Sequence, residues 1–251
     1  MKNLIPHLAA ATLLNVLFLL TAPNEALATT IVVIRGHNEV VLATDSKATY
    51  EGGDAPENAS CVCKIYGDGE LFFAVSGLVA DPENKFNVPE IVADAARGPS
   101  TVAEKVKAIE DRIKAALLTE VPAVKERDPD LYGKLVSGQG IISLVLVGAE
   151  KNVPFVKGIM FTVNSVTENS CPGNCLFGVK TLWLGQSEAI AKHMEAHRVP
   201  HKPFADFARS LVQLEIDAKA EGVGGPIDIL RITPNGTEWI QRKSDCPHIL
   251  P

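Results

Sequence analysis

Two runs of strand-forming residues stand close together near the start of this chain. TTIVVIRG and EVVLATDS lie within residues 29–46 and are separated by Gly36-His37-Asn38. Two β-rich runs on either side of a short turn predict a β-hairpin. A second hairpin is predicted over residues 61–77, where Gly67-Asp68-Gly69 separates CVCKIY from ELFFAVSG. The folded part of the chain is therefore expected to begin with four antiparallel strands.

Helical and strand patterns then follow in blocks. We expect helices over residues 88–97, 101–118 with Ser100 as the cap, 187–197 and 203 to about 221. We expect strands over residues 140–150, 154–164 and 179–185, and a hairpin over 226–241. Loops are expected over residues 121–139, which carry Pro122 and Pro129, and between the strands that end at 164 and begin at 179.

The order of these blocks restricts the fold class. Strands, helices, strands, helices and strands succeed one another, without the alternating βαβ units of a parallel Rossmann sheet. Hairpins imply antiparallel sheets, and helices packed on their outer faces would bury both sides. The sequence therefore predicts an α+β fold with two antiparallel sheets covered by helices.

Residues 1–28 have the composition of a secretory signal peptide. Lys2 gives a positive start, the run LAAATLLNVLFLLTA is short and apolar, and Ala26-Leu27-Ala28 is an A-x-A cleavage site. We expect cleavage after Ala28, which leaves one mature domain over residues 29–251 in the periplasm or outside the cell. An uncleaved N-terminal anchor is the alternative.

Export would place the cysteines in an oxidising compartment. The five are Cys61, Cys63, Cys171, Cys175 and Cys246. Their spacings do not match a zinc finger, so disulfides are expected, and a bridge closing the short loop between residues 171 and 175 is one option. The odd number leaves at least one thiol free or paired between molecules, and the sequence alone does not give the connectivity.

Charge and histidine spacing argue against other classes of function. The formal net charge is -6, which disfavours a nucleic-acid or membrane-surface partner. His193 and His197 lie four residues apart, a spacing that can bind zinc, but no glutamate base lies between them as in H-E-x-x-H. We therefore expect a solvated helix face there, and no metal or cofactor.

The predicted cleavage site gives Thr29 a chemical meaning. A threonine hydroxyl is a poor nucleophile at neutral pH and needs a base. Cleavage after Ala28 would free the α-amine of Thr29, and such an amine titrates at roughly 7.7–8.0. It is therefore partly unprotonated near neutral pH and can accept the hydroxyl proton of its own residue.

The residues after this point resemble the proteasome β-type subunits of the N-terminal nucleophile (Ntn) hydrolases. Those proteins begin with Thr-Thr, as Thr29-Thr30 would here, and continue into a V-x-A-x-D-S-[RK]-A-T segment. Residues 41–49 read VLATDSKAT at the same spacing from the threonine. The lysine strand of the family is similar to Cys63-Lys64-Ile65, and its glycine segment ending in Ala-Asp is similar to residues 76–81, SGLVAD.

This resemblance implies a fold and a catalytic arrangement. The fold is a four-layer αββα sandwich, and the activity is threonine-type hydrolysis of peptide or small amide bonds without a cofactor. Thr29 would be the nucleophile and base. Lys64 would be a cation paired with Asp45, and the Gly77 N–H would stabilise the oxyanion. Family members form rings, so a homo-oligomer is also implied.

One part of the family pattern is altered. The family usually carries an aspartate followed closely by Ser-Gly-Gly near the last helix. Gly224-Gly225 is present here, but Val223 occupies the serine position and Ala220 the aspartate position, with Glu221 as the nearest substitute. Two alternatives therefore stay open: a catalytically impaired proteasome-like oligomeric or binding protein, and a small-molecule amidase on the same fold.

Overall fold

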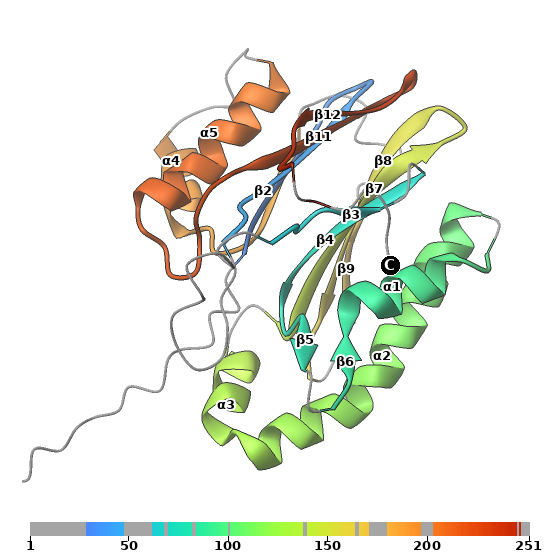
Figure 1. The fold of residues 1–251 in the computed structure, drawn as a ribbon, viewed down its shortest axis with the longest axis vertical. Helices are drawn as coiled ribbons and strands as arrows, with labels where there is room; N and C mark the ends of the chain where they lie inside the picture. The colour runs from blue at the N-terminus through green and yellow to red at the C-terminus, as the bar shows by residue number, and fades with distance from the viewer. Residues whose placement is uncertain are drawn as a thin grey trace, which may run out of the picture.

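The two N-terminal strands lie inside a five-stranded antiparallel sheet (Figure 1). The computed structural model describes residues 29–47, 62–67, 70–81, 84–99, 101–137, 140–163, 166–170, 180–196, 203–244 and 246. The first sheet has the order β10-β1-β2-β11-β12. Its strands are β1 (Thr30–Arg35), β2 (Val40–Thr44), β10 (Lys180–Gly185), β11 (Asp228–Thr233) and β12 (Gly236–Gln241).

The second sheet has the order β3-β4-β7-β8-β9 and is also antiparallel. Its strands are β3 (Tyr66–Gly67), β4 (Leu71–Gly77), β7 (Ile142–Glu150), β8 (Val153–Phe161) and β9 (Val166–Ser170). A short pair, β5 (Ala80–Asp81) and β6 (Phe86–Asn87), follows β4. The helices are α1 (Val88–Ala96), α2 (Val102–Arg127), α3 (Pro129–Ser137), α4 (Glu188–Ala196) and α5 (Phe204–Asp217).

Three apolar clusters lie between four layers of structure. One joins the second sheet to α1, α2 and α3, and includes Phe73 and Ile109. The next lies between the two sheets and includes Ile31 and Val145. The last joins the first sheet to α4 and α5, and includes Leu211. Helices thus cover the outer face of each sheet (Figure 1), which is the predicted αββα sandwich.

Burial on both faces explains the composition of the central strands. Every residue of β2 is buried, as is every residue of β1 before Arg35. A strand covered on both sides has no polar face, so its sequence is continuously apolar and does not alternate. The hairpin of β7 and β8 turns at Lys151 and Asn152, which have φ of 51° and 62°. Positive φ at both positions is the type I′ geometry, so this predicted turn is confirmed.

The prediction of a loop over residues 121–139 is wrong. Helix α2 continues through Pro122 to Arg127, and α3 follows it. Pro122 lacks an N–H and removes one helical hydrogen bond. Val124, Leu131 and Leu135 are nevertheless buried in the apolar layer against the second sheet, and this packing outweighs the local cost.

The helix caps also differ from the expectation. Thr101, rather than Ser100, caps α2: its hydroxyl accepts from the Glu104 N–H at 3.2 Å, and the Glu104 carboxylate accepts from the Thr101 N–H at 3.1 Å. Ser100 itself lies outside the described residues. This capping box satisfies two N–H groups that the first helical turn leaves unpaired.

Two strand predictions need correction. Residues 62–65 are not in a strand, and only Tyr66 and Gly67 pair with β4. The loop predicted after residue 164 contains β9, which pairs with β8. The predicted signal peptide, together with Cys61, Cys171 and Cys175, lies outside the described residues.

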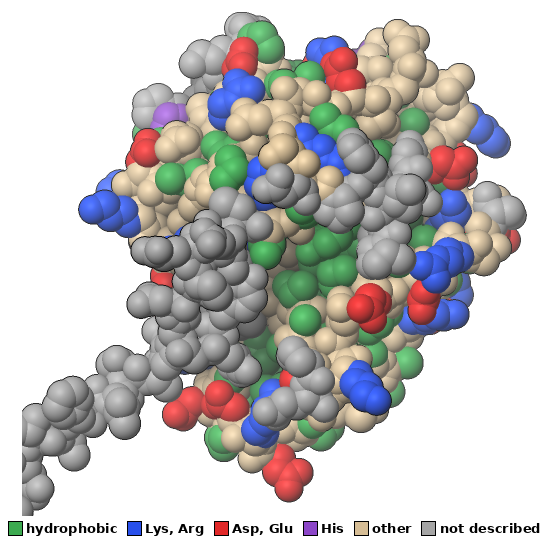
Figure 2. All heavy atoms as spheres, in the orientation of Figure 1, with side chains coloured by type: hydrophobic (Ala, Val, Ile, Leu, Met, Phe, Trp, Pro, Cys, Tyr) green, Lys and Arg blue, Asp and Glu red, His purple; other side chains and the backbone are tan. Residues whose placement is uncertain are grey.

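The described surface carries charges of both signs. On the face in Figure 2, Lys and Arg side chains are interspersed with Asp and Glu, and hydrophobic side chains gather in a hollow near the middle. Within the ranges that the structure describes, no helix has both the length and the apolar character needed to cross a bilayer.

Candidate active site

Asp45 joins four segments of the chain at the end of β2. Its side chain is fully buried. Oδ1 accepts from the Thr30 N–H at 3.0 Å and from Lys64 Nζ at 2.9 Å. Oδ2 accepts from the N–H groups of Lys47 and Gly224, both at 3.1 Å, and from Lys64 Nζ at 3.0 Å. A buried carboxylate with this many donors is well compensated for the loss of water.

Lys64 is the cation of this junction and is 7% exposed. Burial lowers the pKa of its ammonium below the ordinary value, and the nearby charges of Lys243 and Lys47 lower it further. The ion pair and hydrogen bonds with Asp45 act in the opposite direction and favour the charged form. Asp45 is therefore the group that keeps a positive charge at this buried position.

Contacts at Val62 hold the segment that precedes Lys64 beside the end of β2. The Val62 N–H donates to the Ser46 carbonyl at 2.8 Å, and the Ser46 N–H donates to the Gly224 carbonyl at 2.9 Å. Because the segment crosses the end of β2 here, Lys64 reaches Asp45 from outside the sheet.

Thr29 lies directly before β1 and is 6% exposed. Its carbonyl accepts from the Gln186 N–H at 3.0 Å, and the next residue, Thr30, donates to Asp45. A Cβ added at Gly185 would lie 1.7 Å from the Thr29 carbonyl oxygen and 3.3 Å from Ser76 Cβ. The start of β1 therefore approaches the end of β4 on the second sheet, where Gly77 follows Ser76.

Gly77 has a backbone conformation that other residues rarely adopt. Its φ is 97°, and a Cβ at this position would lie 2.2 Å from the Ile141 carbonyl oxygen. The following N–H, from Leu78, donates to that same oxygen at 2.9 Å. Glycine is required here because a side chain would collide with the backbone of Ile141, directly before β7.

The structure brings together Thr29, Asp45 and Lys64, and places Gly77 at the adjacent end of β4. It does not bring Glu221 to this group in the way the sequence suggested. Glu221 is exposed in the loop after α5, whereas Val223 in the same loop is buried and donates its N–H to the Ala220 carbonyl at 3.1 Å. The contact from this loop is the Gly224 N–H to Asp45.

Sequence reasoning missed the backbone donors to Asp45. Thr30, Lys47 and Gly224 act through their N–H groups, which no side-chain pattern reveals. The Gly224-Gly225 pair was the available signal, since glycine permits a close backbone approach. The hydroxyls of Thr44 and Ser46 are also buried here without a hydrogen-bond partner in the described chain.

The arrangement can stabilise negative charge near the start of β1. The buried ammonium of Lys64 is held by the buried carboxylate of Asp45, which also binds the N–H of Thr30, the residue that follows Thr29. Within the part of the chain that the structure describes, no group of three or more His, Cys, Asp or Glu side chains could hold a metal ion. His193 lies in α4, and His197 falls outside the described residues.

Comparisons with known proteins support the fold. No family model and no curated protein matches this sequence. Among solved structures, the Gly-1 mutant of Anbu from Hyphomicrobium sp. strain MC1 is similar to this chain with a TM-score of 0.50. The match covers 88% of this chain and 89% of that chain at 14% identity. At this identity the likeness shows the fold alone, which is consistent with the sandwich of two antiparallel sheets covered by helices.

Proposed function

We propose that this chain is an exported N-terminal threonine hydrolase that cleaves amide bonds, with peptides as the preferred substrate class. The observation that carries the proposal is the bridge made by Asp45, which binds both the Thr30 N–H and Lys64 Nζ. This bridge ties a buried cation to Thr30, the residue that follows the one that leader cleavage after Ala28 would make the first. Export and cleavage are predictions from residues 1–28.

The proposed reaction has two steps. The Thr29 α-amine, through a water molecule, accepts the hydroxyl proton as Oγ attacks the amide carbonyl. The C–O bond forms, the C–N bond breaks, and the proton passes to the leaving amine. A second water then attacks the ester, and its proton returns through the same amine as Oγ is released. The enzyme is regenerated without a cofactor.

Lys64 and Gly77 would assist this reaction electrostatically. The ammonium of Lys64 would favour the unprotonated α-amine by repulsion and the developing alkoxide by attraction. The N–H of Gly77 would donate to the oxyanion, and the loss of one such donor typically costs about 10²–10³ in rate. The close approach of Thr29, Gly185 and Ser76 supports this assignment for Gly77.

The decisive experiment starts from the full chain, expressed with its leader. Mass spectrometry of the mature protein should give Thr29 as the first residue. Thr29→Ala should then abolish hydrolysis of fluorogenic peptide amides, whereas Thr29→Ser should retain part of it because a hydroxyl and an α-amine both remain. A different first residue, or equal rates for wild type and Thr29→Ala, would contradict the proposal.

A non-catalytic binding protein is the second candidate, and Val223 favours it. This side chain is buried and apolar at the position where the resembling family carries a serine. Labelling by an electrophile selective for N-terminal threonine separates the two, because an impaired site would leave Thr29 unmodified. Comparing peptide and small-amide substrates tests the amidase alternative, and sedimentation tests the predicted homo-oligomer.

A further inference from the structure

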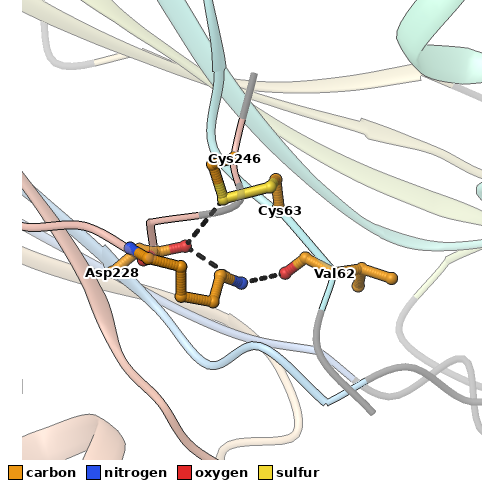
Figure 3. Close-up of a disulfide and its surroundings, with 5 residues drawn as sticks. Val62, Cys63, Asp228 and Cys246 are labelled. Carbon is orange, nitrogen blue, oxygen red and sulfur yellow. Dashed lines mark hydrogen bonds and ion pairs between the residues drawn. A yellow bond between two sulfur atoms is a disulfide. The ribbon is translucent and has the colours of Figure 1, made fainter. Parts of the chain in front are cut away.

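The segment that carries Lys64 lacks the hydrogen-bonded ladder that holds a strand. Residues 62–65 are outside both sheets, although Lys64 must reach a buried carboxylate. On one side the Val62 N–H donates to Ser46. On the other side the segment contacts the C-terminal part of the chain, which is separated from it by more than half of the sequence (Figure 3).

A second buried ion pair makes the first of these C-terminal contacts. Asp228, at the start of β11, is almost fully buried, and its Oδ2 lies 3.2 Å from Lys243 Nζ. The Lys243 N–H donates to Asp228 Oδ1 at 2.9 Å, so the carboxylate holds both the backbone and the side chain of Lys243. Lys243 Nζ then donates to the Val62 carbonyl (Figure 3).

The second contact is covalent. Cys63 and Cys246 form a disulfide whose two Cα atoms are 5.6 Å apart, across a sequence separation of 183 residues. Cys246 is buried and its Sγ lies 4.0 Å from Asp228 Oδ2. Cys63 immediately precedes Lys64, so the bridge fixes the chain one residue away from the ammonium.

We propose that Asp228, Lys243 and Cys246 form a C-terminal clamp whose role is to position Lys64 against Asp45. The proposal rests on the function proposed above, in which the charge of Lys64 assists Thr29. Lys243 and Cys246 are positioning residues, since they contact the segment before Lys64 and not the reacting atoms.

The clamp acts on consecutive backbone and side-chain groups. The N–H of Val62 is held by Ser46, its carbonyl by Lys243, and the side chain of Cys63 by Cys246. A lysine has four rotatable side-chain bonds, so its ammonium can leave Asp45 if the backbone beneath it moves. A displacement of about 1 Å of a charged group can cost about 10²-fold in rate.

Lys243 also contributes a charge. It is a like charge near Lys64 and lowers the pKa of that ammonium, together with burial and Lys47, whereas Asp45 opposes them. Replacing Lys243 by a neutral side chain should therefore raise the pKa of Lys64.

The experiment compares three variants with wild type in steady-state hydrolysis across pH. Lys243→Met should lower kcat by about 10-fold or more, leave KM within about 2-fold, and move the alkaline limb of the pH profile upward. Lys243→Arg should recover most of the rate because it keeps the charge. Lys192→Met, at an exposed position of α4, is the matched control and should leave kcat, KM and the pH profile as in wild type.

The disulfide is tested separately by the double variant Cys63→Ser, Cys246→Ser. It should fold, because the ion pair with Asp228 remains, yet show a reduced kcat of similar size. Lys243→Met could fail to fold because the buried carboxylate of Asp228 loses its ion pair. In that case the double variant Asp228→Asn, Lys243→Met, which removes both charges, takes the place of the single variant. Unchanged kcat and an unchanged pH profile in these variants would overturn the clamp.

A ¹⁵N NMR titration of Lys64 Nζ separates this proposal from the proposed function. In the double cysteine variant, which keeps the charge of Lys243, its pKa should be lower than in wild type because the contact with Asp45 that raises it is loosened, whether or not the protein hydrolyses anything. If wild type and Thr29→Ala prove equally active, the proposed function fails, and the titration still decides the clamp. Identical Lys64 titrations in wild type and the variants would overturn the clamp alone.

Discussion

Asp45 and Glu120 are both buried carboxyl groups, but their surroundings differ. Asp45 accepts from three backbone N–H groups and from Lys64. Glu120 lies in α2 and is 2% exposed, and its Oε1 has no hydrogen-bond partner among the described residues. Its nearest charged neighbours are a second carboxylate, Asp81, and Arg127, which pairs with Asp81 at 2.5 Å.

The difference shows two ways of burying a carboxyl group. At Asp45 the chain provides donors for the charged form, so the group cross-links segments as an anion. At Glu120 burial, together with the hydrogen bond and charge of Asp81, raises the pKa to about 7. That carboxyl therefore keeps its proton in acid solution, and we expect the contact between β5 and α2 to depend on pH.

Asp45→Ala tests the first half of the comparison and should have the largest effect. Removing the carboxylate takes away the ion pair that compensates the buried Lys64 ammonium and the acceptor of three N–H groups. We expect the free energy of unfolding to fall by about 3–5 kcal/mol, with loss of the proposed hydrolysis. Urea denaturation monitored by circular dichroism measures it.

The control for this variant is Asp94→Ala, which removes an exposed carboxylate paired with Arg97 on α1. It should leave the unfolding transition unchanged, because exposed ion pairs contribute little. A similar loss in both variants would mean that the donors around Asp45 do not stabilise the fold more than a surface pair does.

Gly77→Ala tests the segment that links the two carboxyl clusters. Gly77 ends β4, which approaches the start of β1 in space and is followed along the chain by β5. The new methyl group would meet the Ile141 carbonyl at 2.2 Å in a left-handed backbone conformation. We expect about 2–3 kcal/mol of destabilisation from strain and displaced backbone, measured by thermal unfolding. Gly98→Ala, where a Cβ meets nothing within 4 Å, is the control.

Glu120→Gln tests the pH dependence of the second cluster. The pKa of Glu120 rises from an ordinary 4.5 to about 7 on folding. The folded chain therefore holds a proton that the unfolded chain has lost between these values, and stability falls as pH increases from about 4.5 to about 7. Wild type should lose about 2 kcal/mol more than Glu120→Gln between pH 5 and pH 8. Parallel pH profiles for the two proteins would refute this assignment.

Asn84→Ala should have the smallest effect. Asn84 Nδ2 donates to Asp81 Oδ2 at 3.1 Å from an exposed position. Because Arg127 and water remain available to Asp81, we expect a loss of about 1 kcal/mol or less in the free energy of unfolding. A larger loss, measured by urea titration, would show that Asp81 depends on this donor as strongly as Asp45 depends on its own.

The fold was predictable where local signals and packing agree. The β7–β8 hairpin follows from Lys151-Asn152 between two β-rich runs, and the apolar runs of β1 and β2 follow from burial on both faces. The path beyond Pro122 was not predicted, because long-range packing of Val124 and Leu131 overrides a local helix breaker. Asp128, which accepts from the Leu131 N–H at 2.9 Å, with Pro129 at the next position, was an N-cap signal for α3.

The site was predictable only where side chains carry it. The spacing from Thr29 to Asp45 and the resemblance at Lys64 pointed to a pair that the structure contains at 2.9 Å. The catalytic roles of these residues stay predictions. The Cys63–Cys246 bridge was beyond reach, because residues 183 positions apart leave no local pattern and the sequence does not choose among five cysteines.

The strand order of the first sheet has a consequence for how the chain acquires its structure. Strand β1 pairs on one side with β10, so that Thr30 faces Gly185. Contacts across such separations are slow to form, because the entropy of closing a long loop opposes them. A ribosome-bound fragment that ends before β10 can pair β1 with β2 but cannot complete the environment of Thr29, so the first strand of the fold waits for one made about 150 residues later.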